Sequence, residues 1–522
     1  MRLVLLLLWL PLAAAGAGVD PENRRITLAI GSEPPSLDSS IAEDGGSREI
    51  LAAINEGLVY LDQRLNVRPA VAERWDDRGE QVTFHLRKDA RWADGSPVTA
   101  HDFVYAWRRL VDPKTGASGS LSLAWIVENA EEIIAGDLPP SALGVRALDD
   151  HTLVAEKSGP IPFFLEYIGT APFYPLKQSF VEAQGEAYAA EADTLLSNGP
   201  FVLTRWVHGA ELELAANPHY WNRDALKLDA VDIGYVTTDN RTLLNLFTSG
   251  ELATFTLTAE TLEDASEAGI RLRQNPMTGC IGLITFNFRD GRVTANKHLR
   301  KAIQASLDPE TYANRIVAVP ANTPASSMFP SWLGIDDIRL RDLHPPRAIE
   351  IDQAVARSHL ERAAGELGEA PTLTLLSWEG QERQVEYIQG QLKSKLGLDV
   401  RIDKQSYKQA ISRLIGGDFD ISLSRFCGAV RDPDFFASIF HSDDTFNDGR
   451  FSSEEYDRLF ELTRRSRDPG ERMEAFGRLQ EILIEEAVIL PTHEIGEVYA
   501  QDDRLVGLPR FPIRRYARAA IR

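Results

Sequence analysis

Residues 83–113 read TFHLRKDARWADGSPVTAHDFVYAWRRLVDP, and this stretch predicts a strand, a turn and a capped helix in direct succession. The first five residues, 83–87, alternate as a half-buried strand does. Asp94 and the glycine after it favour a turn. Thr99 and Asp102 have the spacing of a capping box, in which each residue satisfies a free backbone amide of the other.

Within the helix that follows, Phe103, Trp107 and Leu110 fall on one face, and an Asp-Pro pair ends the pattern. His101 and Asp102 stand close to two tryptophans, which raises the question of a catalytic pair. Every conspicuous side chain of the stretch nevertheless has a structural role. We therefore assign 83–113 to the scaffold and expect no catalysis there.

The alternation of strands and helices continues on both sides and predicts an α/β fold. Apolar periodicity predicts a helix over 351–367, ended by Gly368, and a buried strand over 371–378. A helix from about 382 to 395 and a strand over 398–403 come next. This β-α-β order is typical of parallel strands. Further strands are expected at 26–31 and 211–216, and further helices at 50–61 and 242–252.

The N-terminus predicts export. Met1-Arg2 is followed by LVLLLLWLPLAAAGAG, and no further charge occurs until Asp20. An apolar segment too short to span a membrane, ending in small residues, is typical of a cleavable secretory signal, here residues 1–17. No cysteine lies near the cleavage region, so we expect no lipid anchor, and no other stretch is apolar enough to span a bilayer.

Composition excludes one class of partner. The 522-residue chain has a formal net charge of -21, which disfavours nucleic acid. Its length suggests about three or four domain-sized units. The C-terminal tail RFPIRRYARAAIR (510–522) is the exception, with five arginines and no acid. It could touch an anionic surface or partner, but we expect a solvated terminal strand.

Motifs of catalysis and metal binding are missing from the sequence. It holds no Gly-x-Ser-x-Gly elbow, no His-Glu-x-x-His and no phosphate-binding loop, and none of its ten histidines are spaced as zinc ligands. The acidic run 441–451 lacks the ligand spacing of a calcium loop. We expect no cofactor and no metal. A secreted hydrolase with an unrecognised site remains the competing class.

Two cysteines occur, Cys280 and Cys427. In an exported chain an even pair suggests a disulfide, which would contribute up to about 5 kcal/mol by restricting the unfolded chain. Two buried free thiols are the alternative.

Five stretches together carry a resemblance to a known family. They are NEGLVYLDQRLNVRPAVAERWD (55–76), the opening stretch 83–113, NGPFVLTRWVHGAELELAANPHYW (198–221), LRKAIQASLDPETY (299–312) and RDPDFF (431–436). The chain resembles the oligopeptide- and dipeptide-binding class of extracytoplasmic solute-binding proteins that serve ABC importers. The likeness runs from about residue 26 to past 490.

The resemblance implies a two-lobed periplasmic-binding-protein fold (type II-like) with an additional third domain and a ligand cleft between the lobes. The resemblance further implies three domains. Domain I comprises 18–55, 186–279 and 495–522; domain II comprises 56–185; domain III comprises 280–494.

It also implies a monomeric periplasmic receptor, without enzymatic activity, that passes oligopeptides or peptide-like solutes to a membrane permease. A non-peptide ligand such as an oligosaccharide or a metal chelate is the alternative, and a signalling receptor shares the fold. Relatives carry a cysteine pair in corresponding surroundings, which implies that Cys280 and Cys427 are joined.

The resemblance points to candidate ligand-binding residues. Glu43 matches an acidic residue that faces the cleft in relatives, although a surface glutamate is an equal alternative. Tyr407 and Phe426 stand where relatives have aromatic residues near the cleft; rings packed on a strand are the structural alternative. Arg413 and Arg425 lie near, but out of register with, arginines that bind peptide carboxylates. Cys427 and Ala429 complete the set.

Ala429 is a departure from the family pattern. Relatives have an aspartate here that meets the peptide ammonium, and they have a tyrosine where Gly119 or Ser120 falls. We therefore expect a ligand that is not anchored by a free α-amine, unless Glu43 or Asp432 compensates.

Overall fold

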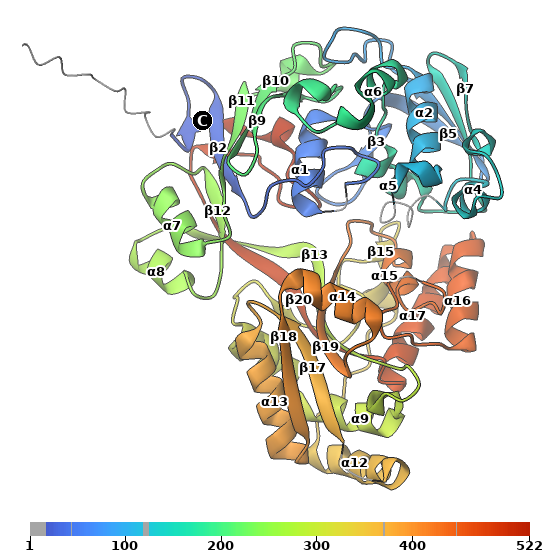
Figure 1. The fold of residues 1–522 in the computed structure, drawn as a ribbon, viewed down its shortest axis with the longest axis vertical. Coiled ribbons are helices and arrows are strands. Elements are labelled where there is room, and N and C mark those ends of the chain that lie inside the picture. Colours follow the sequence, from blue (N-terminus) through green and yellow to red (C-terminus); the bar gives the residue numbers. More distant parts are fainter. Residues whose placement is uncertain (1–16, 43, 118–124, 369–370, 445) are drawn as a thin grey trace, which may run out of the picture.

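Two lobes lie one above the other, and two long strands run between them (Figure 1). The computed structural model describes residues 17–42, 44–117, 125–368, 371–444 and 446–522. The connecting strands are β13 (Leu272–Phe286) and β20 (Ile489–Gln501), which pair antiparallel. The expected α/β, two-lobed architecture is confirmed.

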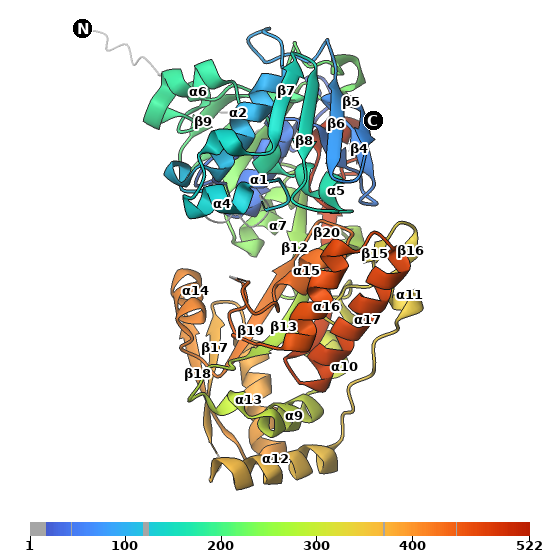
Figure 2. The ribbon, with the colours of Figure 1, turned by 90° about the vertical axis from the view of Figure 1, so that its right-hand side faces the viewer.

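The upper lobe is built on two larger sheets with separate hydrophobic cores. One has five strands in the order β1-β2-β11-β10-β9, and the other has four in the order β5-β6-β8-β7, seen in Figure 2. The strands are β1 (Val19–Asp20), β2 (Arg25–Ile30), β3 (Val59–Leu61), β4 (Val67–Pro69), β5 (Ala72–Asp77), β6 (Gln81–Leu86), β7 (Val145–Asp149), β8 (Thr152–Glu156), β9 (Phe201–Val207), β10 (Glu211–Ala216) and β11 (Ala230–Val236). The helices are α1 (Gly45–Ile54), α2 (Ala100–Val111), α4 (Ala130–Ala135), α5 (Phe164–Ile168) and α6 (Gln178–Gln184).

The opening stretch of the sequence forms the scaffold of the second sheet. The Thr99 N–H donates to the Asp102 carboxylate at 2.7 Å, and the Trp92 indole lies 3.4 Å from the same oxygen. Trp92 and Trp107 are both fully buried in the core. His101 is largely exposed and lies 3.6 Å from Asp150. The predicted capping box is confirmed, and its carboxylate is occupied by the helix end.

The lower lobe is built on a mixed sheet in the order β12-β20-β13-β19-β17-β18, with β14 on β20. β17 runs parallel to both β18 and β19, as the β-α-β pattern predicted. The strands are β12 (Thr254–Leu257), β14 (Thr323–Pro324), β15 (Gly334–Ile335), β16 (Ile338–Arg339), β17 (Thr372–Trp378), β18 (Asp399–Gln405) and β19 (Ile421–Cys427). The helices are α9 (Lys297–Ser306), α10 (Pro309–Thr311), α11 (Leu340–Leu343), α12 (Gln353–Leu367), α13 (Glu382–Leu396), α14 (Tyr407–Gly416), α15 (Asp434–Ser438), α16 (Glu454–Arg465) and α17 (Pro469–Glu485). Two further helices, α7 (Asn240–Thr248) and α8 (Leu262–Glu267), lie beside β12 at the level between the lobes (Figure 1).

The pairing of β13 with β20 is irregular where the strands pass between the lobes. Its register shifts between Asn275 and Cys280. Gly279 in this interval has a φ of 79°, and a Cβ there would lie 2.3 Å from the Gly428 carbonyl oxygen, so only glycine fits. The expected domain limits 279/280 and 494/495 both fall within these two strands, which are continuous across them.

A disulfide holds β19 to β13 at the same level. Cys280 and Cys427 are direct partners in the antiparallel register, and their sulfurs are bonded. The predicted disulfide is confirmed, and the alternative of two free thiols is wrong.

One helix ends earlier than its apolar pattern indicates. A helix was expected to continue to residue 61, but α1 ends at Ile54 and β3 begins at Val59. The Asn198 side-chain amide pairs with the backbone of Glu56, accepting from its N–H at 3.0 Å and donating to its carbonyl at 2.8 Å. This contact with a distant residue takes the place of the backbone hydrogen bonds that a further helical turn would form at Glu56. The apolar pattern of residues 50–61 gives no indication of it.

The expectation of a solvated C-terminal strand is wrong. Phe511 and Tyr516 are buried, and β22 (Ala520–Ile521) pairs with β21 (Leu505–Val506). Tyr516 belongs to the core of the five-stranded sheet. The arginines of the tail therefore sit on a segment fixed within the fold.

The disulfide supplies a first test of this architecture. Replacing both Cys280→Ala and Cys427→Ala should lower the free energy of unfolding by about 2–5 kcal/mol, because the cross-link no longer restricts the unfolded chain. Urea denaturation of the double variant beside the wild type measures the loss. Thiols that can be alkylated in the unreduced wild-type protein would contradict the bond itself.

Candidate ligand-binding site

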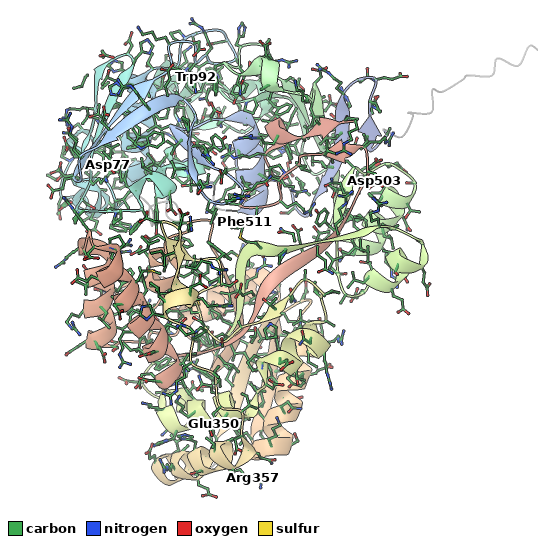
Figure 3. The ribbon with its side chains drawn as sticks, turned by 180° about the vertical axis from the view of Figure 1, so that it is seen from behind. Asp77, Trp92, Glu350, Arg357, Asp503 and Phe511 are labelled. Atoms are coloured by element: carbon green, nitrogen blue, oxygen red, sulfur yellow. A yellow bond between two sulfur atoms is a disulfide. The ribbon has the colours of Figure 1, made fainter. Side chains whose placement is uncertain are left out.

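A cavity of about 800 Å³ lies between the lobes, which is ample for a small solute or short peptide. Figure 3 labels Phe511, one of its lining residues, where the upper lobe faces the lower. The lining comes from the end of β2 and the residue pair after it, the start of α1, the segment after α5, the region of β12, residues 427–430 after β19, and residues 510–515.

Hydroxyl and aromatic groups dominate this lining. Aromatic side chains come from both lobes, and threonines supply most of the hydroxyls; they are Tyr167, Tyr174, Phe255, Phe435 and Phe511, with Thr170, Thr237, Thr238, Thr254, Thr256, Thr258 and Thr278. Within the described residues, no group of three or more His, Cys, Asp or Glu side chains is placed to hold a metal ion. The arrangement can enclose and orient a solute.

Cys427 and Ala429, two of the predicted site residues, line the cavity. They stand at the end of β19, where the chain leaves the lower sheet. The Gly428 N–H between them donates to the Gly279 carbonyl at 2.9 Å. The cavity floor is thereby tied to the crossing strand β13.

Three other predicted residues lie outside the lining. Phe426 stacks on Phe435 with ring centroids 5.2 Å apart, so it supports a lining ring from behind. Arg425 is exposed on β19, and Arg413 on α14 pairs with Asp403 at 2.7 Å.

Glu43 lies outside the described residues, as do Gly119 and Ser120. Tyr407 begins α14, but its side chain is not described. The roles of Glu43 and Tyr407 in binding remain predictions from the sequence.

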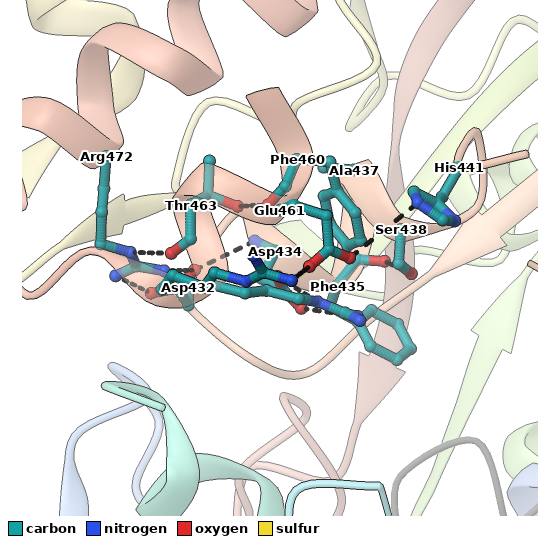
Figure 4. A network of polar contacts seen from close by, with 12 residues as sticks. Asp432, Asp434, Phe435, Ala437, Ser438, His441, Phe460, Glu461, Thr463 and Arg472 are labelled. Carbon is teal, nitrogen blue, oxygen red and sulfur yellow. Dashed lines mark hydrogen bonds and ion pairs between the residues drawn. The ribbon is translucent and has the colours of Figure 1, made fainter. Parts of the chain in front are cut away.

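Asp432, proposed above as a substitute for the missing aspartate, is fully occupied elsewhere (Figure 4). Its two oxygens accept from the Arg472 guanidinium, both at 2.8 Å, and the pair is buried. It also accepts from the Asp434 N–H at 3.0 Å at the start of α15. Compensation by Asp432 is therefore wrong: the side chain caps a helix and neutralises a buried arginine.

The C-terminal segment is the part of the site that sequence analysis missed. Arg510 forms a two-pronged ion pair with Glu497, with both contacts at 2.7 Å. Arg514 binds Glu49 at 2.8 Å. The excess of arginine in this segment, with five arginines and no acid, could have indicated that it pairs with carboxylates elsewhere. Those carboxylates lie on other segments, and only folding brings them close.

Glu166 on α5 joins the two lobes directly. Its carboxylate accepts from the Arg431 N–H at 2.7 Å, and α5 lies above α15 in both views (Figures 1 and 2). The neighbouring Tyr167 hydroxyl lies 3.4 Å from Asp434. Burial, reinforced by the negative charge of Asp432, raises the pKa of Glu166 to about 7, although the Arg431 amide and charge oppose the shift.

Residues 66–448 match the profile described as bacterial extracellular solute-binding proteins, family 5, middle region. The chain belongs to this family. The dipeptide-binding protein DppE of Bacillus subtilis is 30% identical over 92% of this chain and 89% of its own length. Among the described residues of the present family member, no helix has the length and apolar composition needed to cross a membrane.

Solved structures of family proteins match the whole fold. Listeria monocytogenes OppA bound to peptide superimposes with a TM-score of 0.82 at 28% identity, covering 96% of this chain and 99% of that one. Escherichia coli MppA, a murein tripeptide binding protein, gives 0.82 at 26% identity over 95% and 98% of the two chains. Its unliganded open form gives 0.75 at 25% identity over 96% and 98%. Over the whole chain, the structure is therefore more similar to the peptide-bound relative than to the open form.

The Asp432–Arg472 pair should be needed for stability. Asp432→Asn leaves a buried arginine without its counter-charge, which we expect to cost about 3–5 kcal/mol of unfolding free energy. Urea denaturation provides the measurement. The control is Asp342→Asn, which breaks an exposed pair with Arg339 and should cost about 1 kcal/mol or less. Equal losses in the two variants would refute the role of the buried pair.

Glu166 should make stability depend on pH. Its pKa is about 7 in the folded protein against an ordinary value of 4.5, so its contribution is complete below pH 4.5 and declines as pH rises through 7. Glu166→Gln mimics the neutral form, so its melting temperature should match the wild type at pH 5 and exceed it at pH 8. Differential scanning calorimetry at both pH values tests this, with the exposed Glu182→Gln as control. A difference that does not change with pH would show that Glu166 is ionised throughout.

Proposed function

We propose that this chain is a periplasmic receptor that binds peptide-like solutes between its lobes and delivers them to the permease of an ABC importer. The observation that carries the proposal is a cavity of about 800 Å³ between two lobes that share only a few crossing segments. Such a cavity can close around a solute by a hinge motion, driven by contacts that exist only in the closed form. The similarity to the peptide-binding proteins DppE, OppA and MppA favours peptides over an oligosaccharide or a metal chelate.

Several finer features belong to the same proposal. Residues 1–17 act as a cleaved signal, and the mature chain works as a monomer without enzymatic activity. Domain I comprises 18–55, 186–279 and 495–522, domain II comprises 56–185, and domain III comprises 280–494. Domain III is the second ligand-binding lobe and faces domain I, which supplies most of the residues that line the cavity.

The mode of binding follows from the strand ends at the cavity. Gly31 follows β2 in the upper lobe, and Gly428 and Ala429 follow β19 in the lower lobe; all three line the cavity. An extended peptide laid against such strand ends can be held through its backbone, with its side chains left to the surrounding space. Affinity would then depend little on the peptide sequence.

The ligand's amino terminus is the point of difference from amine-binding relatives. Glu49 is the only carboxylate among the described lining residues, and its two oxygens are engaged by Arg514 and the Tyr516 hydroxyl. An ammonium placed beside Ala429 would lose a charge-assisted contact worth about 1.5–3 kcal/mol. We therefore assign this receptor to N-blocked or otherwise modified peptides.

Mass spectrometry of solutes released from the purified protein tests the function. We expect peptide-like compounds, and thermal-shift screening should show stabilisation by peptides. A protein that turns over peptidase or glycosidase substrates, with turnover abolished by one point mutation, would overturn the proposal in favour of a hydrolase.

Ala429→Asp tests the amine argument directly. The new carboxylate should raise affinity for free-amine peptides by about 10- to 100-fold while leaving N-acetylated peptides unchanged or weaker. Titration calorimetry with one tripeptide in both forms measures the ratio, and Ala429→Asn controls for size. Tight binding of free tripeptides by the wild type, abolished by N-acetylation, would mean that another carboxylate, such as Glu43, meets the amine.

A further inference from the structure

The charged side chains that line the cavity are predominantly basic. Four arginines and one glutamate are described there: Arg48, Arg510, Arg514, Arg515 and Glu49. The protein as a whole has a formal net charge of -21, so the cavity has the opposite polarity to the rest of the molecule. A cleft of one sign concentrates ligands of the other sign.

Two of these arginines already have counter-charges within the protein. Glu497 neutralises Arg510, whose side chain is 8% exposed, and Glu49 neutralises Arg514. Both pairs hold the C-terminal segment against the fold. The positive charges of Arg510 and Arg514 are therefore largely neutralised by these structural ion pairs.

Arg515 differs from its two neighbours. It forms no ion pair with any carboxylate in the described part of the chain, and its buried Nε has no hydrogen-bond partner there. The guanidinium carbon lies 4.8 Å from the centre of the Tyr60 ring, and the Tyr174 hydroxyl lies beside the group. An unpaired buried donor is costly unless another molecule completes it.

Glu56 interacts electrostatically with Arg515, but its carboxylate oxygens are bound by other residues. Glu56 is buried, and its two oxygens accept from the Tyr220 hydroxyl at 2.7 Å and the Trp221 indole at 2.6 Å. Arg87 lies over the Trp221 ring at 3.6 Å and adds a second positive charge to that cluster. Glu56 therefore does not neutralise Arg515, which lines the cavity.

The position of Arg515 suits the end of a ligand. It lines the main cavity and also an adjoining cavity of about 720 Å³, which shares with the first the residues Leu61, Phe511, Pro512, Ile513 and Arg515. A group bound at Arg515 can thus lie at the boundary between the two spaces. The Tyr60 ring holds the guanidinium plane, which reduces the entropy lost on binding.

We propose that Arg515 binds a carboxylate of the ligand, so that the receptor selects acidic peptides without a free amino terminus. This inference rests on the proposed peptide-binding function. The carboxylate has two possible sources with the same chemistry: the C-terminus of the peptide or an acidic side chain. A bidentate contact between guanidinium and carboxylate supplies both charge and orientation.

Three synthetic probes separate the possibilities: N-acetyl-trialanine, its C-terminal amide, and the amide of N-acetyl-alanyl-glutamyl-alanine. Titration calorimetry on the dialysed full-length protein should show that N-acetyl-trialanine, which has a free C-terminal carboxylate, binds about 10- to 100-fold more tightly than its C-terminal amide. Tighter binding of the glutamyl amide than of the neutral amide would assign the contact to a side chain. Either preference supports the proposal.

Arg515→Gln should abolish the preference for the carboxylate, and Arg515→Lys should retain part of it. The matched control is Arg518→Gln, on the same segment and also in contact with Tyr60, but lining only the adjoining cavity. This control should keep the full preference. Melting temperatures of all variants show whether they fold. If Arg515→Gln does not fold, the comparison of the acid probe with the amide probe in the wild type still tests whether the site prefers a carboxylate.

The failures of the two proposals are distinguishable. Equal binding of all three probes, or a carboxylate preference that survives in folded Arg515→Gln, would overturn the role of Arg515 and leave peptide binding intact. Absence of binding by every probe, together with no peptide released from the purified protein, would overturn both.

Discussion

The pairing of β13 with β20 is the constraint on which the rest of the structure depends. These strands are continuous through both lobes, so their hydrogen bonds fix where the lobes can separate and where they cannot. In the lower lobe the strands are anchored by apolar burial, with Ile281, Ile284 and Phe286 fully enclosed. Between the lobes the register shifts, and the Cys280–Cys427 bond holds β19 to the pair at that level. The cavity floor is therefore positioned by the same strands that allow a hinge.

Charge pairing determines what this cavity can recognise. Several buried carboxylates near it are bound to an arginine, as in Asp432 with Arg472 and Glu497 with Arg510, because an unpaired buried charge is costly. Those pairs brace the walls, and the one carboxylate among the described lining residues, Glu49, is engaged by Arg514. Arg515 has no carboxylate partner among the described residues, and its Nε has no hydrogen-bond partner there. The proposed preference for a carboxylate over an amine thus follows from how the walls are held together.

Much of the local structure could be predicted, because local structure leaves local patterns. β10 coincides with the alternating run 211–216, and α12 ends before Gly368 as expected. The ends of helices were less predictable where a residue far away in the chain binds the backbone. Helix α1 ends at Ile54 because Asn198 occupies the backbone beyond it, although the apolar pattern continues. Such a contact between segments far apart in the chain has no signature within either segment.

By itself, the sequence determined the fold class and the disulfide, and it placed an alanine at position 429, where the family resemblance implies an aspartate. Each is carried by residue type, periodicity or the spacing of a motif. Only the tertiary structure decided which charges are free. Asp432 and Arg515 look equally available in the sequence, yet one is buried against Arg472 and the other has an unpaired donor at the cavity. Ion pairing depends on distances of a few ångströms between remote segments, and chain order does not encode those distances locally.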